Sequence, residues 1–292
     1  MSVVAIVGAG TLGGTLAQTI AARDRVGSVR IVDEAADVAA GKALDIRQSA
    51  PLDRFGTEVT AHGDVAAAAG ADVVVLAGPA GGPDAEWTDD AALALLDRLG
   101  ARRSGAVVLC AGASHRRLVE RGVAEGRIPR KRLFGTAPEA LRAAVTAVVA
   151  LDVGCPASDV ALTVLGVPPR HAVVPWGQAT VAGQRLEELL PAARLARTRA
   201  RTPLLWPPGP YALAAAAARI VAALVDGAAR VSCCFVVPDG ASGVRRRAVA
   251  APVELDAGGI DRTVEPALTP AELVHLRNGL AALDRDAEDA QG

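Results

Sequence analysis

The sequence is poor in aromatic residues and in lysine. Only 2% of its 292 residues are Phe, Trp or Tyr, whereas 51% are apolar, so the core has to be built from small side chains such as Ala and Val. Small side chains suit helices that pack closely on a sheet. Lysine occurs only at Lys42 and Lys131, and the formal net charge is −1. A chain without a basic excess lacks the electrostatic footprint of a nucleic-acid-binding protein, so we expect no nucleic acid among its partners.

Cysteine and long apolar runs are also scarce. The four cysteines show no metal-ligand spacing, and we expect buried reduced thiols and no metal site. Adjacent Cys233 and Cys234 on a strand would point to opposite faces. No apolar run reaches about 18 residues without a charge, so we expect no membrane span. The opening SVVAIVG enters an apolar strand without a basic leader, which favours a cytoplasmic protein.

Strand-like and helix-like segments alternate regularly in the first half. Runs rich in Val, Ile and Leu at 3–8, 28–33, 57–62, 71–78 and 106–112 have the composition of strands covered on both faces. This alternation predicts an α/β fold with a Rossmann-type, doubly wound parallel sheet. Beyond about residue 140 the pattern changes to a long Ala/Val helix, antiparallel strands, and a terminal helix that begins at Pro270. We predict an α+β C-terminal domain there, joined to the first half in one compact unit.

A glycine-rich turn directly follows the first strand. Residues 8–13 read GAGTLG, the pattern G-x-G-x-x-G, in which the glycines allow a tight turn, close approach of a pyrophosphate and close helix–strand packing. The helix N-terminus after it offers free N–H groups to phosphates. Asp33, at the end of the second strand, would bind an adenosine ribose diol and repel a 2′-phosphate. The motif predicts an NAD site with contacts from Gly8, Gly10, Thr11, Leu12, Gly13 and Asp33.

Nearly the whole chain resembles the lactate/malate dehydrogenase family. VAIVGAGTLGGTLAQTIAARDRVGSVRIVDE is similar to the opening unit of the family, and DVAAAAGADVVVLAG to its approach to the cofactor. PYALAAAAARIVAALVDGAARV and APVELDAGGIDRTVEPALTPAELVHLRNGLAAL resemble its C-terminal helix, hairpin and terminal helix. The resemblance implies an NAD-binding Rossmann domain over 1–137 and a substrate and oligomerisation domain over 138–292. It also implies cofactor contacts from Ala77 and Gly78, a small-molecule substrate, and a homodimer or homotetramer.

The family transfers hydride between a 2-hydroxy acid and NAD. It uses a His as acid/base, an Asp that orients the His, an Arg that clamps the carboxylate, and arginines on a mobile loop. The loop pattern A-G-x-x-R-K-P-G-x-x-R-D-D is matched here by AGPAGGPDAEWTDD, with Gly81 and Gly82 at the basic pair and Trp87 or Thr88 at the second arginine. Arg and Lys are missing from residues 55–97 altogether. The loop arginines are therefore gone.

The loop is acidic instead. Four carboxylates without a counter-ion would repel a 2-oxo acid dianion and suit a cationic or neutral partner. After the fifth strand, Gly112 stands where the family has the Asn of T-N-P, which touches the nicotinamide ribose and the substrate. His115 could reach the same cleft, or it could be a surface histidine at the start of a helix. The loop acids are Asp84, Glu86, Asp89 and Asp90.

The family's paired Asp and Arg are displaced as well. Against the motif L-D-S-A-R, an ungapped alignment puts Leu141 and Ala144 at the Asp and Arg positions. A shift of two residues instead gives an acid-x-x-Arg pair, Glu139 and Arg142, on one helix face. Without the shift, Glu139 would only complement the dipole in the first turn of the helix. Glu139 and Arg142 are candidate catalytic residues under the shifted alignment.

The family's catalytic His is missing from its usual place. Against L-G-G-H-G-D, the chain reads LGVPPRHAVVPW, with Pro168 at the His position. His171 follows three residues later, roughly 10 Å along an extended chain. A re-routed loop could still present His171 to the nicotinamide, so His171 is the third candidate catalytic residue.

Three functions remain open from the sequence. The first is an NAD-dependent oxidoreductase with a non-standard substrate, such as an amine-bearing compound, and the complete dinucleotide motif favours it. The second is a catalytically inactive NAD-binding pseudoenzyme that acts as a partner subunit or regulator, which the joint loss of the catalytic positions favours. The third is ordinary dehydrogenase activity, compensated by residues in the loops.

Overall fold

The first half of the chain forms the predicted parallel sheet. The computed structural model describes residues 2–82, 85–87, 89–100, 105–238 and 247–289. Six strands follow the order β3-β2-β1-β4-β5-β6, and each neighbouring pair is parallel. This is the doubly wound arrangement expected from the alternating pattern. The strands are β1 (Val3–Val7), β2 (Ser28–Val32), β3 (Glu58–His62), β4 (Val73–Leu76), β5 (Val107–Cys110) and β6 (Leu133–Gly135).

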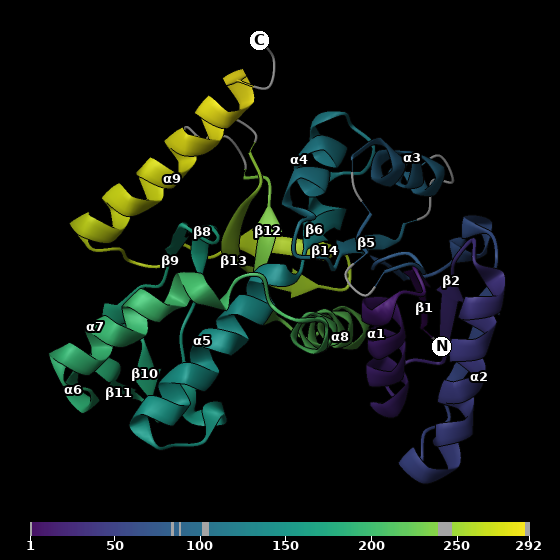
Figure 1. Ribbon diagram of the computed structural model, residues 1–292, viewed down its shortest axis with the longest axis horizontal. Coiled ribbons are helices and arrows are strands. Elements are labelled where there is room, and N and C mark those ends of the chain that lie inside the picture. Colours follow the sequence, from purple (N-terminus) through teal and green to yellow (C-terminus); the bar gives the residue numbers. More distant parts are fainter. Residues whose placement is uncertain (1, 83–84, 88, 101–104, 239–246, 290–292) are drawn as a thin grey trace.

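Helices cover both faces of this sheet. Along β1, Val4 and Ile6 face a core shared with α1, α2 and α8, whereas Ala5 and Val7 face a second core shared with α3 and α4, as the alternation of side chains in a strand requires. Figure 1 shows α8 between α1 and α5, with α3 and α4 on the opposite side of the sheet. The helices are α1 (Thr11–Ala22), α2 (Ala36–Asp53), α3 (Asp89–Gly100), α4 (Arg116–Ala124), α5 (Ala137–Val153) and α8 (Pro210–Asp226), with the short 3-10 helix η1 (Val65–Ala68).

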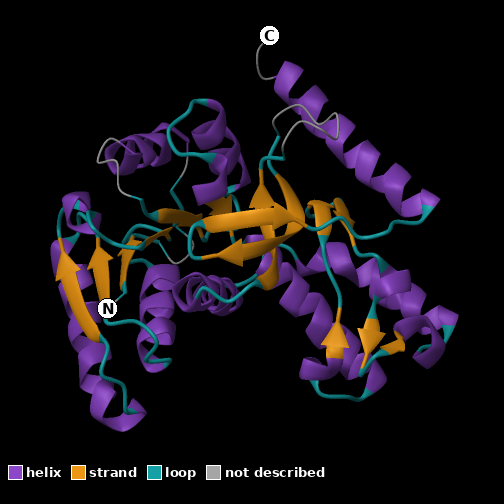
Figure 2. Cartoon of the chain, turned by 180° about the vertical axis from the view of Figure 1, so that it is seen from behind, coloured by secondary structure: helices purple, strands orange, loops and turns teal. Residues whose placement is uncertain are grey.

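The sheet continues past the predicted domain boundary. Phe235 on β12 pairs with Gly135 on β6 in the antiparallel sense, and antiparallel strands extend the sheet to β9. Figure 2 shows these strands as one band across the molecule. The two halves therefore form the compact unit that we expected, while the division at residue 137 stays a prediction. The added strands are β8 (Leu165–Val167), β9 (His171–Val173), β12 (Arg230–Val236), β13 (Val249–Asp256) and β14 (Gly259–Thr263).

Local sequence signals explain most of the second half. β8 and β9 pair on either side of residues 168–170, where the sequence PPR predicts a turn. The composition of residues 186–199 predicts one helix, but that helix is divided because Pro191 has no amide hydrogen for a helical bond. The result is α6 (Leu186–Leu189) and α7 (Ala192–Arg201), beside a small sheet of β7 (Val160–Ala161), β10 (Thr180–Val181) and β11 (Gln184–Arg185). α9 (Pro270–Asp289) packs on β8 and β9 and extends beyond the body (Figure 1).

Cys233 and Cys234 lie on opposite faces of β12, as predicted. Cys233 packs with α5 in one core, and Cys234 belongs to the core under α8. Both cysteines are buried and reduced. Over the part of the chain that is described, no single helix meets the length and hydropathy of a membrane span. Only the bent pair Ala192–Leu205 and Pro210–Asp226 meets them when its two arms are joined.

Candidate functional site

The glycine-rich turn after β1 brings three backbone segments together. Gly8 has a φ of +113°, a left-handed value that favours glycine, and its amide donates to the Val32 carbonyl at 2.7 Å. A Cβ on Gly10 would lie 2.6 Å from the Pro79 carbonyl oxygen, and one on Gly13 would overlap the Gly8 carbonyl. The turn therefore has no room for side chains at these positions, as the motif requires.

The N-terminus of α1 is open to an anion. Its N-cap, Gly10, makes no side-chain capping bond, and the first turn of this fully described helix contains no acidic residue. The first amides of a helix, here those of Thr11 and Leu12, have no intrahelical acceptor and lie at the positive end of the dipole. Lys42 Nζ donates to the Gly10 carbonyl at 2.8 Å; burial lowers the pKa of Lys42, and nearby Asp33 partly opposes this shift. The arrangement fits the pyrophosphate of a dinucleotide.

Asp33 is 5% exposed and connects two segments of the cleft. Its Oδ2 accepts hydrogen bonds from the amides of Ala9 and Ala80, both at 2.7 Å, and its Oδ1 accepts from the amide of Ala35 at 2.9 Å. A carboxylate has about four acceptor sites, so Oδ1 keeps the capacity to bind a ribose hydroxyl. The predicted ribose partner is therefore also the residue that fixes the glycine-rich turn against the segment after β4.

The predicted contacts Ala77 and Gly78 lie where β4 leaves the sheet. The buried Ala77 donates its amide to the Val7 carbonyl at 2.9 Å, and the Gly78 carbonyl accepts from the Gly10 amide at 2.9 Å. All the predicted cofactor residues therefore gather at the carboxyl ends of the parallel strands, where open α/β sheets bind ligands. Their contact with a cofactor stays a prediction. They are Gly8, Gly10, Thr11, Leu12, Gly13, Asp33, Ala77 and Gly78.

A pocket of about 280 Å³ opens beside Asp33. It lies between the ends of β1 and β2, the start of η1, and α3, and the indole of Trp87 forms part of its wall. Its volume is just below the range of about 300–1,000 Å³ that is usual for small-molecule sites, so it can take one part of a dinucleotide.

The acidic loop enters the same cleft. The Glu86 carboxylate accepts hydrogen bonds from the amides of Ala113 at 2.7 Å and Ser114 at 2.9 Å, and also from the Ser114 hydroxyl. The indole Nε1 of Trp87 donates to the Val7 carbonyl at 3.3 Å. A Cβ on Gly112 would lie 2.7 Å from the Glu86 carboxyl carbon. The loop thus spans from the β5–α4 turn, which is the nicotinamide end by resemblance, to the end of β1.

The other loop acids do not all face the cleft. Asp90 pairs with Arg121 at 3.3 Å on the surface, and Glu86 is bonded to amides, so the expectation of four carboxylates without partners is wrong. Asp89 begins α3. Asp84 and Thr88 lie outside the described residues. Of the two loop acids whose side chains are described, Glu86 and Asp90, it is Glu86 that lies inside the cleft.

His115 is buried next to Glu86, which contradicts the surface interpretation. It is 1% exposed, and its Nδ1 accepts a hydrogen bond from the Gly112 amide at 3.0 Å. Burial lowers the pKa of His115, although the Glu86 charge and the nearby Trp87 backbone favour the charged ring. The ring is therefore neutral near pH 7. With Nδ1 as an acceptor, its proton is carried on Nε2.

Glu139 and Arg142 form the predicted pair, but in a structural cluster. Arg142 binds both Glu139 oxygens, at 2.9 and 2.6 Å, and Arg219 approaches one of them at 3.1 Å. The Cys233 amide donates to Glu139 at 3.0 Å. Burial and the Glu139 charge raise the pKa of Cys233 to about 12, so this thiol stays protonated. Sequence reasoning missed Arg219 and Cys233, which lie 80 and 94 residues from Glu139.

His171 lies on β9, the edge strand of the sheet, beneath α9. The ring centroid of His171 is 5.5 Å from that of His275. A Cβ added to Gly279 would lie 2.5 Å from the Cβ of His171, so α9 packs closely on this side chain. Glu139 contacts α8 and β12 instead, so the structure does not bring the three candidate catalytic residues together. Their catalytic role stays a prediction. Leu141, at the family's Asp position, is buried in the core around Trp176.

The site described so far defines a class of protein. A glycine turn, an open helix N-terminus and an acid at the end of the second strand of a doubly wound sheet characterise dinucleotide-binding α/β proteins. Over the described residues, no group of three or more His, Cys, Asp or Glu could hold a metal ion. Residues 2–86 match the family model described as lactate/malate dehydrogenase, NAD binding domain.

Full-length relatives extend this match. The malate dehydrogenase of Desulforudis audaxviator (strain MP104C) is 31% identical over 99% of this chain and 96% of that protein. That of Thioalkalivibrio sulfidiphilus (strain HL-EbGR7) is 30% identical, over 98% of each. The chain belongs to the lactate/malate dehydrogenase family, and NAD, the predicted cofactor, is the one that the family model names.

Solved structures confirm the fold class. Malate dehydrogenase from Salinibacter ruber aligns with a TM-score of 0.86 at 24% identity, covering 99% of this chain and 97% of that one. Cryptosporidium parvum lactate dehydrogenase, complexed with lactic acid and nicotinamide adenine dinucleotide, aligns with a TM-score of 0.87 at 21% identity, covering 100% and 98%. At these identities the likeness is one of fold.

Proposed function

We propose that this chain is an NAD-dependent oxidoreductase whose substrate is not a simple 2-hydroxy acid. The observation that carries the proposal is the contrast between two ends of one cleft. At one end, the Gly8–Gly13 turn, the open α1 N-terminus and Asp33 keep the geometry that a dinucleotide needs. At the other end, Gly112 stands where the family resemblance expects an amide side chain, and the loop that should carry arginines has Gly81 and Gly82 at the basic pair and places Glu86 in the cleft instead.

The residues of this chain have distinct tasks under the proposal. NAD, when bound, would supply a ring that accepts or returns hydride. The Thr11 and Leu12 amides would bind its phosphates, and Asp33 would orient the ribose. His115 is the titratable side chain next to the nicotinamide end, and its Nε2–H could donate a hydrogen bond to a substrate oxygen.

The charge of the cleft restricts the substrate. Glu86 places a carboxylate at the turn between β5 and α4, and the family's loop arginines are missing from the sequence. A 2-oxo acid dianion would meet repulsion there, whereas a neutral carbinol or an amine-bearing compound would not. We therefore expect a neutral or cationic substrate.

A second candidate is a catalytically inactive NAD-binding pseudoenzyme that serves as a partner subunit or regulator. The observation that favours it is that the candidate catalytic side chains make contacts outside the predicted nucleotide cleft. Glu139 is bonded to Arg142, Arg219 and a backbone amide, and His171 packs against α9. We also propose that the protein is cytoplasmic and forms a homodimer or homotetramer.

Fluorescence titration with NADH and NADPH tests the proposal. We expect NADH to bind more tightly than NADPH, and Asp33→Asn to reduce that preference because the ribose acceptor is weakened. Asp37→Asn on the exposed side of α2 is the matched control. Failure of both nucleotides to bind would refute the dinucleotide site. If NADH binds but a panel of carbinols and amines changes neither its absorbance nor that of NAD, the second candidate stands.

A further inference from the structure

The turn that precedes helix α4 is bound by a residue from a distant loop. The N-cap of the helix, His115, makes no side-chain capping bond, and the first turn of the helix has no acidic residue. Just before the N-cap, the amides of Ala113 and Ser114 donate to Glu86, which is 27 and 28 residues away in the sequence. The contact therefore joins two separate parts of the cleft.

Three features make the turn specific for a carboxylate. Two amides and the Ser114 hydroxyl converge on the two Glu86 oxygens. The site lies at the positive end of the nine-residue helix α4. Gly112 leaves the space that the carboxyl group fills, since a Cβ there would lie 2.7 to 2.9 Å from all three of its atoms. The residue that replaces the family's Asn is thus the one that makes room for Glu86.

Neighbouring contacts fix the loop beyond Glu86. The buried His115 lies close to the Glu86 charge and to the Trp87 backbone, and both favour its charged form. The Trp87 indole is bonded to the Val7 carbonyl and forms part of the wall of the pocket beside Asp33. Glu86 binding at the turn therefore decides where Trp87 lies in the nucleotide cleft.

We propose that the Ala113 and Ser114 amides and the Ser114 hydroxyl form a carboxylate-binding site, and that Glu86 is its resident internal ligand. In this bound state the loop keeps Trp87 in the cleft and competes with a dinucleotide for the space. A dinucleotide has to displace the Trp87 indole, so its apparent affinity is reduced by the fraction of molecules in which Glu86 holds the loop in this place. The effect on nucleotide affinity rests on the proposed function; the carboxylate site does not.

Chymotryptic cleavage after Trp87 tests the site without any nucleotide. The sequence has few aromatic residues, so this product is easily assigned. We expect Glu86→Ala and Gly112→Ala each to raise the cleavage rate roughly tenfold or more, because each removes several charge-assisted hydrogen bonds that hold the loop. Gly112→Ala does so without changing the loop itself. Asp90→Asn, on the exposed start of α3, is the matched control and should cleave like the wild type.

Equal cleavage rates in all four proteins, with circular dichroism showing them folded, would overturn the proposal. Glu86→Gln keeps the size of the side chain and lacks the charge, so an intermediate rate is expected if the carboxylate is what the turn recognises. NADH titration of the same variants is the second arm, in which Glu86→Ala should bind more tightly than the wild type. If cleavage responds but no variant binds NADH, the proposed function fails and the carboxylate site stands. If NADH binds to all variants with equal affinity and the cleavage rate is unchanged, the carboxylate site fails and the proposed function stands.

Discussion

At the scale of single residues, buried or half-buried carboxylates connect segments that are distant in sequence. Asp33 accepts from Ala9 and Ala80, Glu86 from the β5–α4 turn, and Glu139 from the β12 backbone. Where the amide is buried, as at Ala9 and Cys233, loss of its acceptor would cost about 1–3 kcal/mol. The acids of the cleft therefore organise its loops, whatever further role they have toward a ligand.

His115 gives stability a dependence on pH. Its pKa is lowered in the folded protein, mainly by burial, so between the folded value and the unfolded value of about 6.5 the unfolded state binds more protons. Stability is therefore complete above about pH 6.5 and is lost as pH falls, by at most about 1.4 kcal/mol per pH unit. We expect His115→Asn, whose side-chain oxygen can still accept from Gly112, to lose this component. Urea unfolding from pH 7.5 to 5 measures it.

The control for this prediction is His62→Gln, which replaces a histidine that contacts Thr60 on β3. Its stability should fall with acid in parallel with that of the wild type. Parallel curves for His115→Asn and the wild type would contradict the assignment, because they would mean that His115 takes up no extra proton on unfolding.

The sequence predicted some residues of the site and missed others, and the difference lies in how far apart the contacting residues are in the sequence. The Gly8–Gly13 turn and Asp33 lie in one βαβ unit, so spacing alone identified them. The pair Glu139 and Arg142 was found because both sit on one helix face. The Glu86 contacts with Ala113 and Ser114 were missed because they depend on how a loop folds over the sheet. No spacing rule links an acid to amides 27 residues away.

At the scale of elements, α9 begins with a reciprocal capping box. The Glu272 carboxylate accepts from the amide and hydroxyl of Thr269, and the Glu272 amide donates back to that hydroxyl at 3.3 Å. We expect Thr269→Ala to lower stability by about 1 kcal/mol and the melting temperature by roughly 2–4 °C. Thr269→Ser, which keeps the hydroxyl, should behave like the wild type in differential scanning calorimetry. If Thr269→Ala has the same melting temperature as the wild type, α9 must unfold before the rest of the molecule.

Element boundaries followed from sequence where a single residue decides them. Gly154, with a φ of +81°, ends α5, and Pro270 opens α9 as the sequence predicts. Pro191 was overlooked, so one helix was predicted where two exist. The pairing of β6 with β12 could not be predicted, because it joins Gly135 to Phe235 across the middle of the chain. Which strands become neighbours is decided by packing of the whole sheet.

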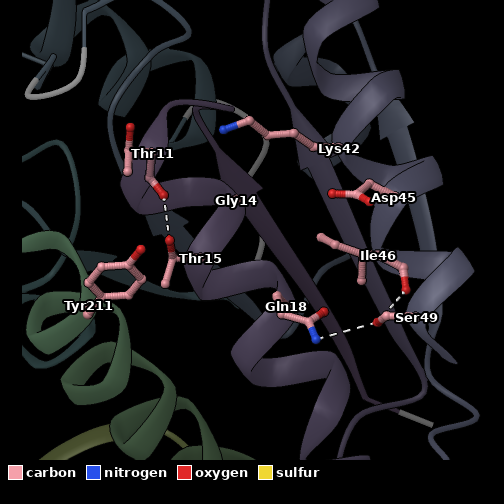
Figure 3. Close-up of a pocket in the computed structure, with 9 residues that line it drawn as sticks. All are labelled: Thr11, Gly14, Thr15, Gln18, Lys42, Asp45, Ile46, Ser49 and Tyr211. Carbon is pink, nitrogen blue, oxygen red and sulfur yellow. Dashed lines mark hydrogen bonds between the residues drawn. The ribbon is translucent and has the colours of Figure 1, made fainter. Parts of the chain in front are cut away.

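At the scale of the whole molecule, one side around α8 has the properties of an interface. Figure 3 shows a pocket between α1 and α2 with Tyr211 of α8 at its edge, and its volume is about 470 Å³. A second pocket of about 570 Å³ lies on the Ala-rich face of α8 and is lined by five arginines. Burial, Arg219 and Arg25 lower the pKa of one of them, Arg23, because like charges crowd there. The arginines are Arg23, Arg25, Arg142, Arg219 and Arg230.

A second copy of the chain can complement this side. The exposed face of α2 carries Asp37 and Asp45 next to Leu44 and Leu52, of which Leu52 is 84% exposed. Acidic and apolar groups on α2 of one copy would match the arginines and alanines around α8 of the other. In a two-fold dimer each pair of surfaces occurs twice, so both pockets would be covered in both copies.

Light scattering coupled to size-exclusion chromatography tests this arrangement. We expect the 29.5 kDa chain to elute at twice or four times its mass, and Leu52→Glu or Tyr211→Glu to halve the observed mass, since each buries a charge in the apolar contact. Val274→Glu on the exposed side of α9 places the same charge on a helix that extends from the body, and it should leave the assembly unchanged. Salt screens the attraction between the arginines of one copy and the acids of the other, so the monomer should be favoured as salt rises. A wild-type mass of one chain would exclude the interface, and loss of assembly in Val274→Glu alone would move it to α9.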